Sequence, residues 1–470
     1  MISLKKSTVK LTASLNAVIA HFHQLPNNER VNNIVKRVAA MKEDEVEKSF
    51  QNVMQEFAHR HHNFKELMMD SFLRTEKIHG ILSHFSETRK LLLGSFLTKE
   101  YSIQSAALFN PSIVPHPEQS GLQAGEQRFV MSLRATGEGH ISSIIFETGV
   151  VNELGDVTLD KPSGYFTVLK KDENEIFSKE FIQKRMVLPD ITATNVLKSL
   201  PGNFTASEAQ SISKNHLPQE SVSLEEIFDA NYKLTSSPDV PLSEKVIFPS
   251  ARCESMGMED LRLVRFEDAG EAVYYGTYTA YNGKQIKPQL LVTKDFTDFE
   301  IRTFYGNAVN DKGMALFPEK VNGKYYMISR QGSELISIMC SDDLYHWEKY
   351  ELLLEPEFDW EFVQIGNCGS PIKTEKGWLL LTHGVGAMRK YVISAILLDL
   401  YNPSKIIGRL HKPLLYAGEV EREGYVPNVV YTCGLLRHNN LLIIPYAVSD
   451  TATTFASVQL DEVLNEMMMQ

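Results

Sequence analysis

A unit of two short β-strands recurs along the sequence, and this repeat constrains the fold more than any other feature. Each unit pairs an inner strand that carries a polar residue with a second strand that ends in an acidic turn, as in "TKDFTDFE" and "SDDLYHWE". The units occupy residues 128–148, 272–300, 323–348, 377–405 and 441–464. Five such units, rich in aromatic and β-branched residues, are typical of a radial repeat. The repeat therefore predicts an all-β, five-bladed β-propeller.

A propeller would bring distant parts of the chain to one central funnel. The innermost strands of the blades direct their polar side chains toward the axis. We therefore expect five side chains to lie near one another despite their separation in sequence: Arg134, Tyr278, Arg330, His383 and Asp450.

Two segments lie outside the repeat. Apolar residues at helical spacing, such as Val46 and Phe50, predict that residues 1–100 form a helical N-terminal extension. Residues 101–470 would form the propeller, interrupted by a partly helical stretch at 170–245. Long insertions in compact domains are often functional, so this stretch is either an insert between blades or a lid.

Composition excludes several classes of protein. The net charge of −11 provides no sequence-wide basic field for nucleic acid or anionic lipid. The N-terminus lacks the pattern of a signal peptide, and no apolar run is long enough to span a bilayer. The four cysteines are widely spaced, without a CxxC pair, which argues against a zinc site or a disulfide framework and favours a reducing cytoplasm. No P-loop, GxGxxG or HExxH motif calls for a cofactor or a metal.

A histidine-rich run, several aromatic residues and the N-terminal helices allow ordinary structural roles as well as functional ones. The run "HRHH" at 59–62 is expected to be solvated surface, because adjacent helical residues do not share a face. The tyrosines around Tyr281, and Trp360, could stack on sugar rings, but core packing is the ordinary role of such side chains. If the N-terminal helices expose an apolar face, we expect a homo-oligomer through them.

Acidic residues at strand ends suggest chemistry on a glycosidic bond. Cleavage of that bond needs an acid to protonate the leaving oxygen, and inverting hydrolases use a second carboxylate to activate water. Phosphorolysis needs a cationic cradle for phosphate instead. The candidate acids are Glu259, Asp260, Glu319, Glu361 and Asp450. The candidate cations are Arg134, Arg262, Lys287, Lys312, Arg330, His383 and Arg409. For any one of these residues, a role in a turn or in a surface ion pair explains its presence about as well as a role in the site does.

The order and spacing of nine motifs resemble those of one family. The motifs are "FNPS" (109–112), "SLRA" (132–135), "MEDLR" (258–262), "YTAYNG" (278–283), "KGMALFPEKVNGKYYM" (312–327), "IGNCGSPIKTEKGWLLLTHGV" (365–385), "DLYNPSKIIGR" (399–409), "YVPNVVYTCG" (425–434) and "SDT" (449–451). From about residue 105 to 465 the chain resembles glycoside hydrolase family 130, the inverting β-mannoside phosphorylases and β-mannosidases. The resemblance implies a five-bladed propeller acting on an oligosaccharide.

The resemblance also implies roles for residues of this sequence. Asp260 would be the general acid, its proton passing through a sugar hydroxyl. The substrate would be held by Asn110, Arg134, Arg262, Tyr281 and Asp450. Phosphate would be bound by Lys287, Lys312, Arg330 and His383. If the enzyme is a hydrolase, Glu319 or Glu361 would serve as the base.

Three departures from the family pattern alter the expected phosphate cradle. Leu261 stands in place of a proline, Lys287 in place of an arginine, and Ser329 in place of a histidine. Phosphorolysis with inorganic phosphate as co-substrate, and no other cofactor, is slightly favoured. A β-mannosidase and a non-catalytic carbohydrate-binding propeller are the alternatives.

Overall fold

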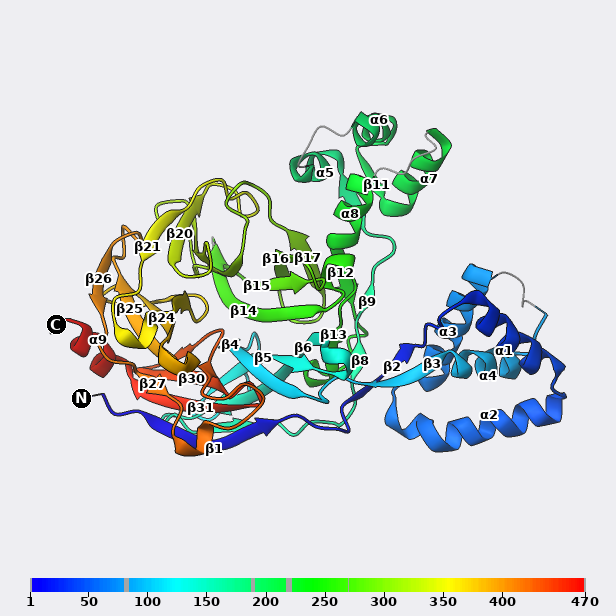
Figure 1. Ribbon diagram of the computed structural model, residues 1–470, viewed down its shortest axis with the longest axis horizontal. Coiled ribbons are helices and arrows are strands. Elements are labelled where there is room, and N and C mark those ends of the chain that lie inside the picture. The colour runs from blue at the N-terminus through cyan, green and yellow to red at the C-terminus, as the bar shows by residue number, and fades with distance from the viewer. Residues whose placement is uncertain (1, 80–83, 187–190, 217–221, 269, 469–470) are drawn as a thin grey trace.

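The structure is a computed structural model that describes residues 2–79, 84–186, 191–216, 222–268 and 270–468. It is built mostly from antiparallel β-sheets, with two groups of helices that project from the β-structure (Figure 1). No helix in these residues is long and apolar enough to cross a membrane.

The first two groups of strands are joined into one twelve-stranded sheet. A short parallel contact between Ser142 and Gly257 links them. The first group consists of β4 (Ala107–Pro115), β5 (Gln127–Thr136), β6 (Ser142–Val151) and β7 (Val157–Leu159). The second group consists of β14 (Gly257–Asp268), β15 (Glu271–Tyr281), β16 (Ile286–Thr293) and β17 (Phe299–Thr303).

Three further groups follow along the chain, each as a separate sheet. One contains β18 (Lys312–Leu316), β19 (Tyr325–Arg330), β20 (Ile336–Ser341) and β21 (Glu351–Leu354). The next contains β22 (Gln364–Asn367), β23 (Ile372–Lys373), β24 (Trp378–Val385), β25 (Tyr391–Leu398), β26 (Ile406–Arg409) and β27 (Leu415–Tyr416). The last contains β28 (Val430–Tyr431), β29 (Leu436–His438), β30 (Leu441–Val448), β31 (Ala452–Gln459) and β1 (Lys5–Thr12).

Strand β1 was not anticipated, because residues 1–100 were expected to be helical. It pairs antiparallel with β31, with Lys5 opposite Ser457 and Thr12 opposite Ala452. The start of the chain thus forms the outer strand of the last sheet, which Figure 1 shows as a blue arrow beside the red strands.

The rest of the N-terminal segment forms a helical unit. Val46 and Phe50 are buried in it, as their helical spacing predicted. The unit consists of α1 (Asn28–Ala40), α2 (Glu43–Phe57), α3 (Phe64–His79) and α4 (Glu87–Phe96), with the paired strands β2 (Val18–Phe22) and β3 (Thr98–Ser102) connecting it to the sheets. The expectation of solvated surface at 59–62 was wrong for His61, which is buried with its Nε2 2.9 Å from a Glu100 carboxylate oxygen.

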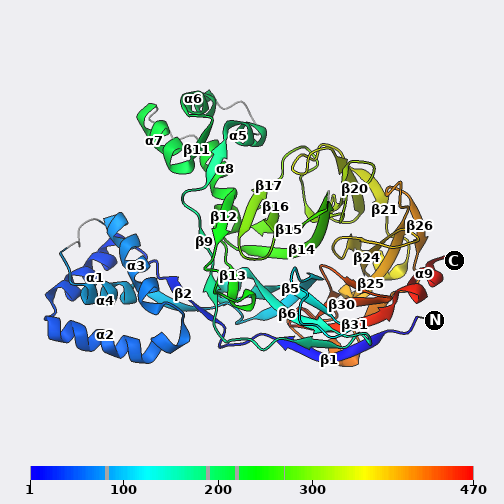
Figure 2. The same ribbon diagram turned by 180° about the vertical axis from the view of Figure 1, so that it is seen from behind.

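The insertion also carries helices, and its base is anchored on β17. Arg302 forms a 2.6 Å ion pair with Glu175, and the Asn231 side-chain oxygen accepts the Thr303 N–H at 2.8 Å. The remaining elements are β8 (Thr167–Val168), β9 (Lys170–Lys171), β10 (Ile176–Ser178), α5 (Lys179–Arg185), α6 (Ile191–Ser199), β11 (Asn203–Thr205), α7 (Ala206–His216), α8 (Val222–Ala230), β12 (Tyr232–Thr235) and β13 (Lys245–Ile247). The helices α6 and α7 lie away from the sheets and from the N-terminal helices in both views (Figures 1 and 2), whereas α5 contacts β17 through Arg185 Nε, which donates to the Thr303 hydroxyl at 3.2 Å.

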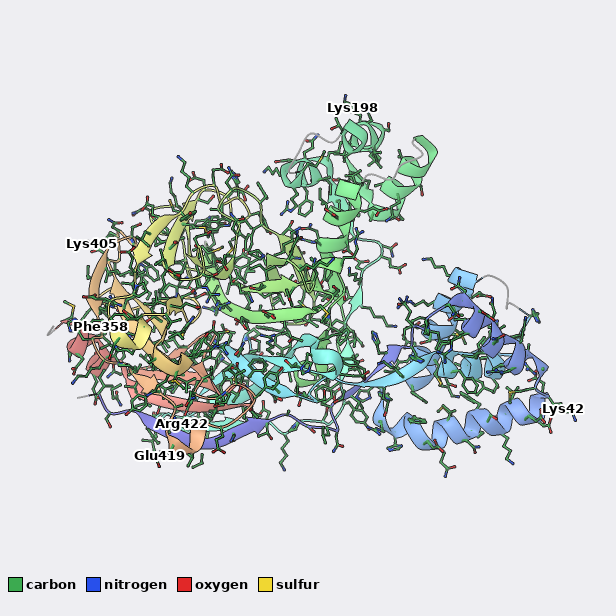
Figure 3. All side chains as sticks on the ribbon, viewed as in Figure 1. Lys42, Lys198, Phe358, Lys405, Glu419 and Arg422 are labelled. Carbon is green, nitrogen blue, oxygen red and sulfur yellow. The ribbon has the colours of Figure 1, made fainter. Side chains whose placement is uncertain are left out.

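The apolar core lies between neighbouring sheets. For example, Phe317 from the third group packs edge-on against Trp378 of the fourth, and both are fully buried. Figure 3 shows side chains filling the spaces between the ribbons, with Lys198 and Lys42 labelled out on the two projecting helical groups. The chain ends in α9 (Leu460–Met468), which packs on the last sheets.

Candidate active site

The backbone of β14 is irregular where it carries Asp260. The pairing with β15 shifts register between Glu259 and Arg262, so this segment contains a β-bulge. Asp260 lies in the left-handed region with φ 56°. A bulge turns a side chain away from the regular alternation, and such strained positions cluster at functional sites. The bulge changes the direction in which the Asp260 side chain points.

Two other inner strands have the same irregularity. The register of β4 shifts at Asn110, whose φ is 50°, and that of β18 shifts beside Gly313, whose φ is 78°. Asp450, in the turn between β30 and β31, also has a left-handed backbone, with φ 48°. The chain therefore has unusual backbone geometry where several sheets contribute to one site.

Asp260 is surrounded by hydrogen-bond donors and cations. Asn110 donates its side-chain N–H to Oδ1, and the guanidinium groups of Arg134 and Arg262 lie 3.6 and 3.7 Å from the carboxylate. Burial opposes ionisation, but Arg262, Arg134 and Lys312 together outweigh it and hold the pKa of Asp260 below its usual value. Asp260 is thus ionised at neutral pH in the free protein.

Glu259, the neighbour of Asp260, bridges two of these cations. Its Oε1 accepts from Arg134 Nη2 and its Oε2 accepts from Lys312 Nζ, each at 2.9 Å. The side chain is 14% exposed, so both ion pairs are largely shielded from water. Nothing in the sequence around Glu259 indicated that it would bridge Arg134 and Lys312.

Arg262 connects Asp260 to the last sheet. It is 3% exposed, and its Nη2 donates to the Tyr431 hydroxyl at 2.8 Å while its Nη1 donates to the Asp260 carbonyl at 2.9 Å. Burial raises the pKa of Tyr431 well above its usual value, so its hydroxyl keeps its proton. We had not singled out Tyr431, although it lies within the motif at 425–434.

His383 is buried beside this pair. Its ring stacks on Tyr391 and meets Tyr431 edge-on, with centroids 5.8 and 4.9 Å apart. Burial, and then the nearby Arg330 and Arg262, lower the pKa of His383 to about 3. The imidazole is therefore neutral at pH 7 and offers a hydrogen bond rather than a charge, which corrects its place among the candidate cations.

Lys312 and Arg330 face each other across β18 and β19. The Arg330 Nε is buried without a hydrogen-bond partner, and none of the ion pairs among the described residues involves this arginine. A guanidinium with unused donors next to an ammonium is a suitable anion site.

Asp450 contributes a second carboxyl group close to Asp260. Burial and the charge of Asp260 raise the pKa of Asp450 to about 6, with Arg134 and Arg389 acting in the opposite direction. Arg389, which we had not singled out, follows β24 in a left-handed turn with φ 54°.

Unpaired polar atoms gather in the same place. A buried donor or acceptor without a partner costs about 1–3 kcal/mol, so it usually faces water or a ligand. In the part of the chain that the structure describes, the site atoms without a protein partner include Asn110 Oδ1, Arg262 Nε, Arg330 Nε, Asn367 Oδ1 and His383 Nε2. These atoms could receive the hydroxyl groups of a sugar and the oxygens of an anion.

Some predicted site residues lie elsewhere. The prediction for Tyr278 was wrong: it is buried between sheets, and its hydroxyl donates to Glu254 at 2.6 Å. Lys287 is exposed on β16 and lines a separate hollow of about 270 Å³ beside the insertion. Tyr281 ends β15 opposite Gly257, near the bulge but with no described contact to Asp260. Strand alternation could not separate these positions, because the middle of β15 and of β16 is buried on both faces and only the strand ends are open.

The two glutamates expected to act as base in a hydrolase have other partners. Glu319 lies beyond the end of β18 and forms a surface ion pair with Lys373. Glu361 is fully buried, accepts the backbone N–H groups of Glu357 and Phe358 at 2.8 and 3.1 Å, and pairs with Arg409. Arg409 is therefore also outside the cluster around Asp260. The Glu319 contact is that of a surface pair. All three Glu361 contacts involve its Oε1, and its buried Oε2 has no partner among the described residues.

The geometry defines a polar, cation-rich site in which the carboxyl group of Asp260 is held at a bulge. The family model described as beta-1,4-mannooligosaccharide phosphorylase, glycoside hydrolase 130, matches residues 219–469, more than half of the chain. The chain belongs to glycoside hydrolase family 130.

Individual relatives are similar over about half of this chain. The 1,2-beta-oligomannan phosphorylase of Thermoanaerobacter sp. (strain X514) is 34% identical over 228 residues, which cover 47% of this chain and 75% of that protein. The beta-1,2-mannobiose phosphorylase of Listeria innocua serovar 6a is 32% identical over 237 residues, 48% of this chain and 64% of that protein. A solved structure of a Listeria innocua beta-1,2-mannobiose phosphorylase with beta-1,2-mannobiose has a TM-score of 0.49 at 23% identity, covering 78% of this chain and 93% of that one.

Proposed function

We propose that this protein cleaves β-mannosidic bonds by phosphorolysis with inversion, transferring a mannosyl group to inorganic phosphate. Membership of the family supports β-mannoside cleavage. The observation that carries the choice of phosphate is the buried Arg330 donor without a partner, opposite Lys312 and near His383. Activation of water needs no such set of cations, whereas a phosphate dianion does.

The site residues have the following proposed roles. Asp260 is the general acid, while Asn110, Arg134, Arg262 and Asp450 hold the mannosyl group. Lys312, Arg330 and the neutral His383 bind phosphate. For Lys287 and Tyr281 the proposal is limited to the outer part of the substrate or its approach, because their described contacts lie outside the cluster.

The electrostatics suggest an order of events. In the free protein the cations keep Asp260 ionised. A phosphate dianion beside Lys312 and Arg330 neutralises them, so the pKa of Asp260 rises and the carboxyl group gains a proton. That proton passes, through a sugar hydroxyl, to the leaving oxygen as its bond to the anomeric carbon breaks. A phosphate oxygen forms the new bond from the opposite face, giving an α-mannosyl phosphate and a shortened sugar.

We also propose that the successive sheets are the five blades of a propeller around this site. The grouping of strands and the convergence of residues from every group at Asp260 support this arrangement. Under this proposal β1 belongs to the propeller at 101–470 rather than to the N-terminal extension, and the insertion at 170–245 is an arm on the second blade.

The four cysteines are unpaired, in keeping with the expected reducing cytoplasm. Assembly of copies through the N-terminal helices stays a prediction.

The decisive experiment is a panel of β-1,2- and β-1,4-linked manno-oligosaccharides, each incubated with and without phosphate. We expect mannosyl phosphate to form, and turnover to depend on phosphate. Mannose released at an unchanged rate without phosphate would instead assign a hydrolase. The Asp260→Asn variant should lose about 10²–10⁴-fold in kcat, the usual contribution of a general acid. A parent protein that binds these sugars but cleaves none would assign a binding propeller.

A further inference from the structure

We propose that Glu259 is a positioning residue that couples the mannosyl pocket to the phosphate site, holding Lys312 in the free protein and releasing it to phosphate. The inference rests on the proposed function and adds a role for a residue that takes no part in the chemistry itself.

The geometry of Glu259 carries the proposal. Its two carboxylate oxygens each accept one hydrogen bond at 2.9 Å, one from Arg134 on the sugar side and one from Lys312 on the phosphate side. Arg134 comes from β5 and Lys312 from β18, so the single carboxylate joins two different sheets. Arg134 also lies 3.6 Å from Asp260, which places Glu259 one contact away from the acid.

A phosphate that binds Lys312 must compete with Glu259 for the same ammonium group. The carboxylate and the dianion carry the same sign, and both lie in a site shielded from water. Removing the charge of Glu259 frees Lys312 and makes the site one charge more positive. We therefore expect the Glu259→Gln variant to bind inorganic phosphate about tenfold more tightly than the parent.

The shared carboxylate also predicts cooperation between the two substrates. When phosphate binds Lys312, the Glu259 carboxylate pairs with Arg134 alone. This stronger pair holds the Arg134 guanidinium in position for the mannosyl group. Phosphate and mannoside should then raise each other's affinity by the same factor, on the order of fivefold, since such coupling is reciprocal. The Glu259→Gln variant should lose this coupling and show a lower kcat, because Arg134 is no longer held.

The chain offers a matched control in Glu300. This residue on β17 also bridges a lysine and an arginine, with Lys233 at 3.2 Å and Arg302 at 2.8 Å, but it lies three strands away from β14. The Glu300→Gln variant removes the same charge from the same kind of bridge outside the site. We expect its phosphate affinity and kcat to equal those of the parent.

The test is calorimetric titration of the full-length protein with inorganic phosphate, with and without a β-mannoside, together with kcat and KM for phosphate. The expected result is a lower dissociation constant, a lower KM for phosphate and a lower kcat in E259Q, and none of these in E300Q. Glu259→Asp keeps the charge and should bind phosphate as the parent does; a tenfold gain in affinity in this variant would contradict the charge argument, even if E259Q folds poorly.

Each other outcome has a definite meaning. If the parent needs phosphate but E259Q binds it no more tightly, or E300Q shows the same gain, the coupling role is refuted while the proposed function stands. If the parent neither binds nor needs phosphate, the proposed function fails, and this inference fails with it.

Discussion

Asp450 is proposed to hold the sugar, and keeping its carboxyl group ionised in the folded protein should cost stability. Its partly buried carboxyl group lies near the charge of Asp260, and its pKa is raised to about 6. Its backbone is left-handed, with φ 48°, a conformation that asparagine adopts as readily as aspartate. The Asp450→Asn substitution therefore removes a partly buried charge without adding backbone strain.

The size of the effect follows from the pKa. The usual value is 3.8, and a difference of about two corresponds to about 3 kcal/mol. Because the folded state binds this proton more tightly than the unfolded chain does, stability falls as pH rises from about 4 to about 6, and the full cost is present above that range. Allowing for partial exposure, we expect the variant to be about 2 kcal/mol more stable than the parent at pH 7.5, and about half that at pH 5.

The assay is urea unfolding of parent and variant at both pH values, read as the shift of the transition midpoint. Asp342→Asn is the control, since Asp342 has an 82% exposed side chain and should change the midpoint little. The same Asp450 variant should lose binding of the mannoside, because this carboxylate is proposed to hold the sugar. An Asp450→Asn protein no more stable than the parent at pH 7.5, or one whose advantage grows as pH falls, would refute the reasoning.

Three further changes test other parts of the structure. Gly366→Ala would place a Cβ 2.4 Å from the His383 ring. We expect thermal unfolding to show a free energy of unfolding about 1–3 kcal/mol lower, and kcat/KM to fall clearly. Parental values of both would contradict the close packing of Gly366 against His383. Glu361→Gln removes the charge facing Arg409 and should lower the free energy of unfolding by about 3 kcal/mol, while turnover with phosphate persists. Lost turnover at full stability would instead make Glu361 a catalytic group. Deletion of residues 2–12 exposes the edge of β31 and should lower the melting temperature and cause aggregation in light scattering; a monodisperse, equally stable product would show that β1 is dispensable.

Local sequence determined most of the helices and strands. Helical spacing around Val46 and the two-strand repeat are short-range patterns, because the period of the apolar residues follows the local geometry of a helix or a strand. The helices α1 to α4 and most strands of the repeat therefore lie where the pattern predicted. Asp260 was found through the order of motifs along the chain, since an acid at a strand end is otherwise indistinguishable from a turn residue.

Only the tertiary structure decided which polar side chains meet. Tyr278 and Tyr431 both belong to apolar strands, yet Tyr278 lies between sheets and Tyr431 binds Arg262. Alternation along a strand does not distinguish them, because the sheets bury both of their faces and a bulge shifts the direction of the side chains that follow. The pairing of β1 with β31 joins residues more than 400 positions apart, and the bridge from Arg134 through Glu259 to Lys312 spans three strands. Such contacts depend on how complete sheets pack together, and no local pattern of residues encodes that packing.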